Sequence, residues 1–222
     1  MSKLRVHCFS VSADGYGAGP NQSEAHPLGE GGMKLHKWHL LTRTFHQMHG
    51  MEGGVSGVDD DFVARGTEHI GAWILGRNMF GPIRGPWTND EWKGWWGDNP
   101  PYHVPVFVLT HHPRPSIEMQ GGTVFHFVTG DIHATLAAAR EAAQGKDVRL
   151  GGGVSTLRQY LEAKLVDEMH LAVSPMVLGS GENLFAEMDL PGLGYRAARH
   201  VTTPLALHIV FDRDAEISDS NP

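Results

Sequence analysis

The stretch that decides the fold is DVRLGGGVSTLRQYLEAKLVDEMHL, residues 147–171. A short apolar strand over 148–150 enters three consecutive glycines, and a helix is expected to follow over 156–164. Glycine inside a regular element costs roughly 0.5–1 kcal/mol relative to alanine, so a triplet needs a reason. One reason is a tight turn. The other is an anion, because a turn without β-carbons can bring backbone N–H groups against a phosphate at the positive end of a helix.

The composition predicts one globular domain with a sizeable core, since 41% of the 222 residues are hydrophobic and 19% are charged. We expect this domain to span residues 1–214, with a disordered tail over 215–222. The net charge of -7 argues against a nucleic-acid-binding protein, which normally carries a basic surface. The single cysteine, Cys8, excludes an internal disulfide, and we expect a cytoplasmic protein. No apolar run approaches the roughly 20 residues that span a bilayer, and the N-terminus lacks the pattern of a signal peptide.

Apolar patterns place strands and helices in alternation along the chain. Strands are expected over residues 5–11, 72–75, 104–109, 123–128, 148–150, 168–175 and 205–212. Helices are expected over 59–69, 131–144 and 156–164, and one more is indicated by a helically spaced apolar stripe: Leu35, Trp38, Leu41, Phe45 and Met48. Residues 17–32 form a long loop, and loops of that length are often functional. This alternation predicts an α/β domain with a largely parallel sheet covered by helices on both faces.

Three junctions between a strand and the next element carry residues suited to phosphate. They are Gly76-Arg77-Asn78, the run Thr110-His111-His112-Pro113-Arg114, and Gly151-Gly152-Gly153. In parallel sheets, ligands bind outside the carboxyl ends of the strands, where such junctions meet. The triplet alone fits neither Gly-x-Gly-x-x-Gly nor the P-loop pattern. Two further junctions with basic side chains favour a nucleotide with several phosphates, because the planar arginine side chain suits them.

The ordered set of motifs resembles the dihydrofolate-reductase-like fold. It is closest to the reductase domain of riboflavin-biosynthesis bifunctional deaminase-reductases, and it is similar to uncharacterised bacterial dihydrofolate reductase family proteins. The resemblance covers about residues 5–212. It rests on these motifs and the three junctions: Ser12-Ala13-Asp14-Gly15, Met79-Phe80, Leu165-Val166-Asp167-Glu168-Met169-His170-Leu171 and Pro175-Met176-Val177-Leu178-Gly179-Ser180-Gly181. It implies a mostly parallel central sheet, helices on both faces and an antiparallel C-terminal strand.

The resemblance also implies an NADPH-dependent reductase of a small heterocycle: a pteridine, a pyrimidine or a flavin-like compound. Arg77 and the helix start at Asn78, after Gly76, would hold the pyrophosphate. The 2′-phosphate would face Thr110, His111 and Arg114. The remaining cofactor residues are Gly151, Gly152, Gly153, Ser155 and Thr156, and the Gly151–Gly152 peptide is expected to be cis.

Substrate contacts are expected from Asp14, His36 and Phe80. Asp14 lies beside the substrate by its position in the family, although Asp-Gly is also an ordinary turn pair. His36 lies off the apolar stripe of its helix, so it could equally face the ligand or solvent. The catalytic residue is not identified, and the first helix lacks the carboxylate that binds pterin in dihydrofolate reductases. The segment 85–103, with four tryptophans and a tyrosine, could close over a planar heterocycle or pack against a second subunit.

Two other functions stay open. The chain could be a binding protein that kept the reductase fold without its chemistry. It could also be a metal-dependent hydrolase built on His39, His46 and His49, although no carboxylate joins them at a suitable spacing and no metal is expected.

We further expect a homodimer. The glycine-rich run over 175–184 is hard to place in the core of a monomer, and the apolar strand over 205–211 would need a cover if it lay at a sheet edge.

Overall fold

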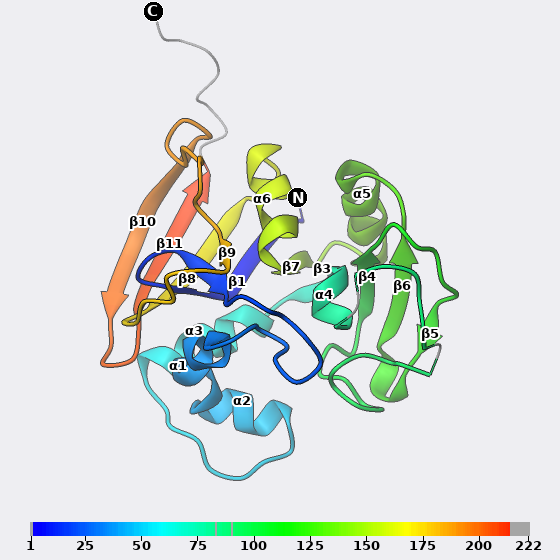
Figure 1. The fold of residues 1–222 in the computed structure, drawn as a ribbon, viewed down its shortest axis with the longest axis horizontal. Coiled ribbons are helices and arrows are strands. Elements are labelled where there is room, and N and C mark those ends of the chain that lie inside the picture. Colours follow the sequence, from blue (N-terminus) through cyan, green and yellow to red (C-terminus); the bar gives the residue numbers. More distant parts are fainter. Residues whose placement is uncertain (1, 83, 90, 214–222) are drawn as a thin grey trace, which may run out of the picture.

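The computed structural model describes residues 2–82, 84–89 and 91–213, and its centre is a nine-stranded sheet (Figure 1). In spatial order the strands are β10 (Tyr195–Thr202), β11 (Leu207–Arg213), β8 (Glu168–Ser174), β1 (Leu4–Ser12), β7 (Asp147–Gly152), β3 (Ile70–Gly76), β4 (Pro105–Leu109), β6 (Val124–Val128) and β5 (Ile117–Glu118). The six strands from β8 to β6 are parallel, whereas β10, β11 and β5 run antiparallel to their neighbours. Two short strands, β2 (Tyr16–Ala18) and β9 (Glu182–Asn183), pair beside this sheet. The predicted tail over 215–222 lies outside the described residues.

Helices cover both faces of the sheet, as predicted (Figure 1). On one face α5 (Ile132–Ala142) and α6 (Val154–Glu162) bury Leu136 and Leu157 in the larger apolar core. On the other face lie α1 (Lys37–Leu40), α2 (Arg43–Met48) and α3 (Val58–Thr67). The short α4 (Arg77–Phe80) follows β3, and two 3-10 turns, η1 (Gly32–His36) and η2 (Gln120–Gly122), complete the elements. No helix in the described residues is long and apolar enough to cross a membrane.

The strand β1 contains a bulge that divides it into two halves. Val6 pairs with Met169 and Phe9 with Leu171, so β1 has one residue more than its partner between these pairs. Cys8 adopts the left-handed conformation there, with φ at 57°. The bulge therefore turns both His7 and Cys8 toward the α1–α3 side, while Val6 and Phe9 both enter the larger core.

The face of the sheet toward α3 carries a buried hydrogen-bonded network. The Cys8 amide donates to His170 Nδ1 at 3.2 Å, so His170 Nε2 carries the proton and donates to His208 Nδ1 at 3.0 Å. His208 Nε2 in turn donates to Asp59 at 2.7 Å, which ties α3 to β11. Burial lowers the pKa of His170 to about 2, because the charged imidazolium would lose its contact with water.

A second branch of the network centres on Glu168. Its carboxylate accepts from His7 Nε2 at 2.9 Å and from Arg65 at 3.1 Å. The hydrogen bond from His7, together with the charge of Arg65, lowers the pKa of Glu168 to about 2. Burial lowers the pKa of His7 to about 4, since His7 is only 3% exposed. His7 and His170 are therefore both neutral in the folded protein near neutral pH.

The predicted helix through Leu35 and Met48 is wrong as a single element. The chain forms η1, α1 and α2 instead, and it breaks at Thr42, whose side chain caps α2 by accepting from the Phe45 amide. As a result Leu41 is 44% exposed rather than part of a buried stripe. Asp131 caps α5, since its side chain accepts from the His133 and Ala134 amides at 2.8 Å each.

The C-terminal strands correct one premise of the dimer prediction. The strand expected over 205–212 is β11, and it lies between β8 and β10 rather than at an edge. The edge strand on this side of the sheet is β10, which was not predicted from the sequence. In the run over 175–184, Val177 is 71% exposed but Leu184 is fully buried in the protein's own core. The apolar late strand therefore needs no second subunit to cover it, and the homodimer itself stays a prediction.

Candidate functional site

The three predicted junctions meet at the carboxyl edge of the parallel sheet. Gly76 ends β3 in register with Leu109 of β4, so Arg77 and Thr110 follow on neighbouring strands. A β-carbon on Gly76 would lie 2.3 Å from the Thr156 hydroxyl and 3.2 Å from the Gly153 nitrogen. Only glycine allows this approach, and it brings the end of β3 against the start of α6.

The three glycines of the triplet differ in their surroundings. Gly151 lies inside β7, where a β-carbon would meet Leu75 at 2.6 Å. Gly152 has a φ of 112° and would place a β-carbon 3.0 Å from the Phe9 ring. Gly153 is the N-cap of α6, and nothing lies within 4 Å of a β-carbon built on it. Open space at this edge therefore begins at Gly153, beside the first turn of α6, whose leading amides have no acceptor within the helix.

The cis peptide bond joins Gly152 to Gly153, so its predicted position at Gly151–Gly152 is wrong by one residue. The reason is that β7 continues through Gly152, which pairs with Leu75 of β3. The turn into α6 starts one residue later than the sequence indicated. Ser155 is exposed at the start of α6, whereas Thr156 is buried against Gly76.

Two arginines approach the same tryptophan beside this junction. The Arg77 guanidinium carbon lies 3.4 Å from the ring centroid of Trp87, and that of Arg114 lies 4.9 Å away. Burial, followed by the charge of Arg114, lowers the pKa of Arg77 to about 10, so it remains a cation. The Arg77 Nε atom is shielded from solvent and has no partner among the residues that the structure describes. Such a pair of cations fits a multiply charged anion such as a phosphate.

The loop after β4 is ordered by its own hydrogen bonds. The Thr110 hydroxyl accepts from the His112 amide at 3.1 Å, and Trp87 Nε1 donates to the His112 carbonyl at 2.8 Å. Thr110 is 7% exposed and therefore shapes the loop, whereas the His111 side chain is exposed. Trp87 thus contacts both basic junctions, a role that sequence reasoning missed. The four tryptophans of 85–103 were its only signal.

The predicted loop over 17–32 is shorter in the structure, because the predicted range starts inside β2 and ends at the first residue of η1, and it runs from the end of β1 toward α4. A β-carbon on Gly17 would lie 2.7 Å from Val154 at the start of α6. Farther along, the Gln22 side-chain oxygen accepts from Asn78 at 3.1 Å and from Arg84 at 2.7 Å. The Asn78 side chain is therefore engaged by the loop, and the loop covers the edge where the glycine triplet ends.

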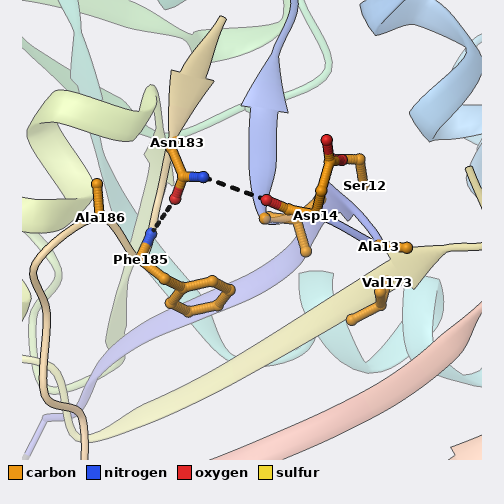
Figure 2. A pocket seen from close by; sticks show the side chains of 9 residues that line it. Ser12, Ala13, Asp14, Val173, Asn183, Phe185 and Ala186 are labelled. Carbon is orange, nitrogen blue, oxygen red and sulfur yellow. Dashed lines mark hydrogen bonds between the residues drawn. The ribbon is translucent and has the colours of Figure 1, made fainter. Parts of the chain in front are cut away.

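A hollow of about 420 Å³ lies at the ends of β1 and β8, with Asp14 and Phe185 in its lining (Figure 2). The Asp14 carboxylate accepts from the Leu178 and Gly179 amides at 3.1 and 2.8 Å. Hydrogen bonds from Ser12 and from these amides lower its pKa. Figure 2 shows Asn183 joining the Asp14 carbonyl to the Phe185 amide. Asp14 therefore holds the loop after β8 in place, while lining the hollow.

The other predicted substrate residues lie in different surroundings. Phe80 is 1% exposed and packs against Trp87, Phe125 and Phe127, so its ring belongs to the core. His36 lies where η1 meets α1, and burial lowers its pKa to about 4. Its Nε2 atom is shielded from solvent and has no partner in the described part of the chain, so it is available to a water molecule or a ligand.

The histidines considered as metal ligands are used locally. His46 Nδ1 bonds the Glu52 carbonyl at 2.9 Å, and His49 Nδ1 bonds the Phe45 carbonyl at 2.8 Å. Among the described residues, the group with three ligand atoms within 4.8 Å of one another is His7, Cys8 and His170. The charge of Arg149 acts on the Cys8 thiol and would oppose a metal cation there.

Comparison with known proteins gives the family. The model of the RibD C-terminal domain matches residues 6–208. Uncharacterized protein YyaP of Bacillus subtilis (strain 168) is 43% identical over 44 residues, which are 20% of this chain and 23% of that protein. A putative riboflavin biosynthesis protein from Shewanella sp. PV-4 has a TM-score of 0.60 at 21% identity, covering 96% of this chain and 99% of that one. A pyrimidine reductase-like protein from Corynebacterium diphtheriae has a TM-score of 0.53 at 12% identity, covering 97% and 93%. A fold like that of these proteins and a family match over nearly its whole length show that the chain belongs to the RibD C-terminal domain family, a family of reductase type.

Proposed function

We propose that this protein is an NADPH-dependent reductase of a small heterocycle, with a pyrimidine or pteridine as the favoured substrate class. The observation that carries the proposal is the pair of guanidinium groups at Trp87. One of them belongs to Arg77, which directly follows Gly76, and Gly76 packs against Gly153 at the open edge. A dinucleotide phosphate needs several cationic donors at a distance from the reacting ring, and this edge supplies them. Membership of a reductase-type family supports the same reading.

The residues present fit the cofactor. Arg77, with its unpartnered Nε, would bind the pyrophosphate together with the first amides of α6. Arg114 would bind the 2′-phosphate, with Thr110 shaping the loop and His111 at its exposed side. The space beyond Gly153 would admit the nicotinamide ring. When bound, NADPH supplies the hydride; the loop over 17–32 would keep water from that edge.

The favoured acceptor is a pyrimidine or pteridine ring because the family and its relatives point to that class. The Corynebacterium diphtheriae relative is named a pyrimidine reductase-like protein. A flavin-like compound is the larger member of the same chemical group. A binding protein without turnover would hold the same ligands, so the rate of NADPH oxidation with a heterocyclic acceptor separates the two.

Calorimetric titration tests the cofactor assignment. We expect NADPH to bind more tightly than NADH, because only NADPH carries the 2′-phosphate that Arg114 would meet. Arg114→Ala should remove most of this preference, at about 1.5–3 kcal/mol for a lost charged hydrogen bond. Equal affinity of the unaltered protein for the two cofactors would contradict the 2′-phosphate assignment.

A further inference from the structure

The indole ring of Trp87 lies between two of the predicted junctions and attracts a cation from each. The Arg77 guanidinium carbon lies over the ring, 3.4 Å from its centroid, and the Arg114 guanidinium carbon lies 4.9 Å from the same ring. Both distances fall within the roughly 6 Å over which a cation is attracted to an aromatic face. One aromatic side chain therefore gathers two cations that come from separate parts of the chain.

Neighbouring rings fix the orientation of Trp87. Its ring centroid lies 5.8 Å from that of Phe80 at an interplanar angle of 82°, and 5.1 Å from that of Phe127 at 77°. Such edge-to-face contact is a preferred arrangement of aromatic pairs. Phe80 belongs to α4 and is 1% exposed, whereas Phe127 belongs to β6. The Trp87 ring is therefore held from two elements of the fold.

The indole N–H of Trp87 holds the loop that carries Arg114. Trp87 Nε1 donates to the His112 carbonyl at 2.8 Å, and the His112 amide donates to the Thr110 hydroxyl at 3.1 Å. Arg114 follows His112 by two residues. The place from which the Arg114 side chain starts therefore depends on the hydrogen bond that Trp87 makes.

A second tether joins Arg114 to the helix that begins with Arg77. Arg114 Nη1 donates to the Trp92 carbonyl at 3.0 Å, and Trp92 Nε1 donates to the Phe80 carbonyl at 2.9 Å. Phe80 is the last residue of α4, and Arg77 is the first. The tryptophan-rich segment therefore links the two basic junctions through backbone carbonyls as well as through the Trp87 ring.

The two arginines carry like charges, and the ring offsets the repulsion between them. Burial, and then the charge of Arg114, lower the pKa of Arg77 to about 10. The negative face of an aromatic ring attracts guanidinium groups and so opposes their separation. The Arg77 Nε atom has no partner among the described residues, which leaves it available as a donor to an anion. Trp87 thus keeps two cations near one ring while its own N–H is already engaged.

We propose that Trp87 is a positioning residue that sets the preference for NADPH over NADH, by holding Arg77 and Arg114 where the pyrophosphate and the 2′-phosphate would bind. The inference rests on the proposed function and adds a residue that acts through both arginines. The face of the ring would position Arg77, and the indole N–H would position the loop that carries Arg114. The two parts of the side chain have separable effects, because phenylalanine keeps a ring without the N–H and leucine keeps neither.

Calorimetric titration with NADPH and with NADH tests the inference in three variants, and the ratio of the two affinities measures the preference. Trp87→Phe loses the bond to the His112 carbonyl but keeps a face for Arg77, so NADH affinity should stay within about threefold while the preference falls about tenfold. Trp87→Leu should also weaken NADH about tenfold, because Arg77 loses its ring. Trp95→Phe is the control. It loses a similar indole bond, to the Asn78 carbonyl at 3.2 Å, but leaves Trp87 in place, so it should keep the preference of the unaltered protein.

Two results would overturn the inference while the proposed function stands: an unchanged preference in Trp87→Phe, or an equal loss of preference in Trp95→Phe. Thermal unfolding followed by circular dichroism checks that each variant is folded. If Trp87→Leu does not fold, Trp87→Phe decides alone, because its ring can still pack against Phe80 and Phe127. Equal affinity of the unaltered protein for NADPH and NADH would refute the 2′-phosphate assignment and the inference with it. Binding of neither cofactor would refute the proposed function as well.

Discussion

Acidification should destabilise this protein well above the pH at which carboxylates protonate. His7 and His170 are 3% and 0% exposed, and burial lowers their pKa values to about 4 and about 2. In the unfolded chain both would titrate near 6.5. Below that pH the unfolded state binds two protons that the folded state does not, so the free energy of unfolding falls as pH falls.

The size of the effect follows from the pKa difference. At pH 5 each of the two histidines lowers the free energy of unfolding by about 2 kcal/mol. The reason is that pH 5 lies about 1.5 units below the unfolded pKa, and each unit is worth about 1.36 kcal/mol. Together they lower the free energy of unfolding by about 4 kcal/mol, and the whole free energy of unfolding of a native protein is typically about 5–15 kcal/mol. His36 and His39 shift in the same direction, with pKa values of about 4 and about 3. The lowered pKa of Glu168 stabilises the folded protein at neutral pH. This stabilisation is lost only below about pH 4.5, as the pH falls toward the Glu168 pKa of about 2.

Urea unfolding followed by circular dichroism at several pH values between 7 and 5 measures this slope. His170→Phe should reduce the slope by about one proton, or about 1.4 kcal/mol per pH unit, since its ring can still stack on Phe62. Tyr160→Phe loses the hydrogen bond to the Ile132 carbonyl and should lower stability equally at every pH in this range. A flat profile from pH 7 to 5, or an unchanged slope in His170→Phe, would refute the reasoning.

Three further outcomes are expected. Arg77→Ala should weaken NADPH and NADH alike by about 1.5–3 kcal/mol, because both carry the pyrophosphate; unchanged calorimetric affinities would contradict this. Gly153→Ala should melt near the temperature of the unaltered protein yet lose NADPH binding, since its β-carbon would enter open space. Gly152→Ala should also melt at a lower temperature, because Gly152 has a φ of 112° and a β-carbon there would contact Phe9. Normal NADPH binding by Gly153→Ala would rule out a nicotinamide at that position. We expect a homodimer, and a light-scattering mass near 24.3 kDa at micromolar concentration would show a monomer instead.

Much of the fold could be predicted because the parallel strands are buried on both faces and read as apolar runs. The strand β10 could not, since residues 196–200 are all exposed and polar or small, and nothing in their pattern distinguishes a strand from a loop. The division between α1 and α2 was missed for another reason. Its signal is one capping residue, Thr42, inside an apolar pattern that looks continuous.

The site could be predicted in outline, because the carboxyl edge of a parallel sheet collects the junctions between strands and helices. What the sequence does not show is which side chain within a motif points where. Phe80 belongs to the same short motif as Arg77, yet it packs into the core. Arg77 and Trp87 come from separate segments, and only the folded chain brings the Arg77 guanidinium 3.4 Å from the Trp87 ring centroid.

The bulge in β1 shifts the alternation of side chains between the two faces of the sheet by one residue. Before it the even-numbered residues Leu4 and Val6 enter the larger core, and after it the odd-numbered Phe9 and Val11 do. One residue has been inserted without turning any other side chain over. Deleting Cys8 should therefore restore regular pairing with β8 while every remaining residue of β1 keeps its face, but the buried network would lose the hydrogen bond that the Cys8 amide donates to His170.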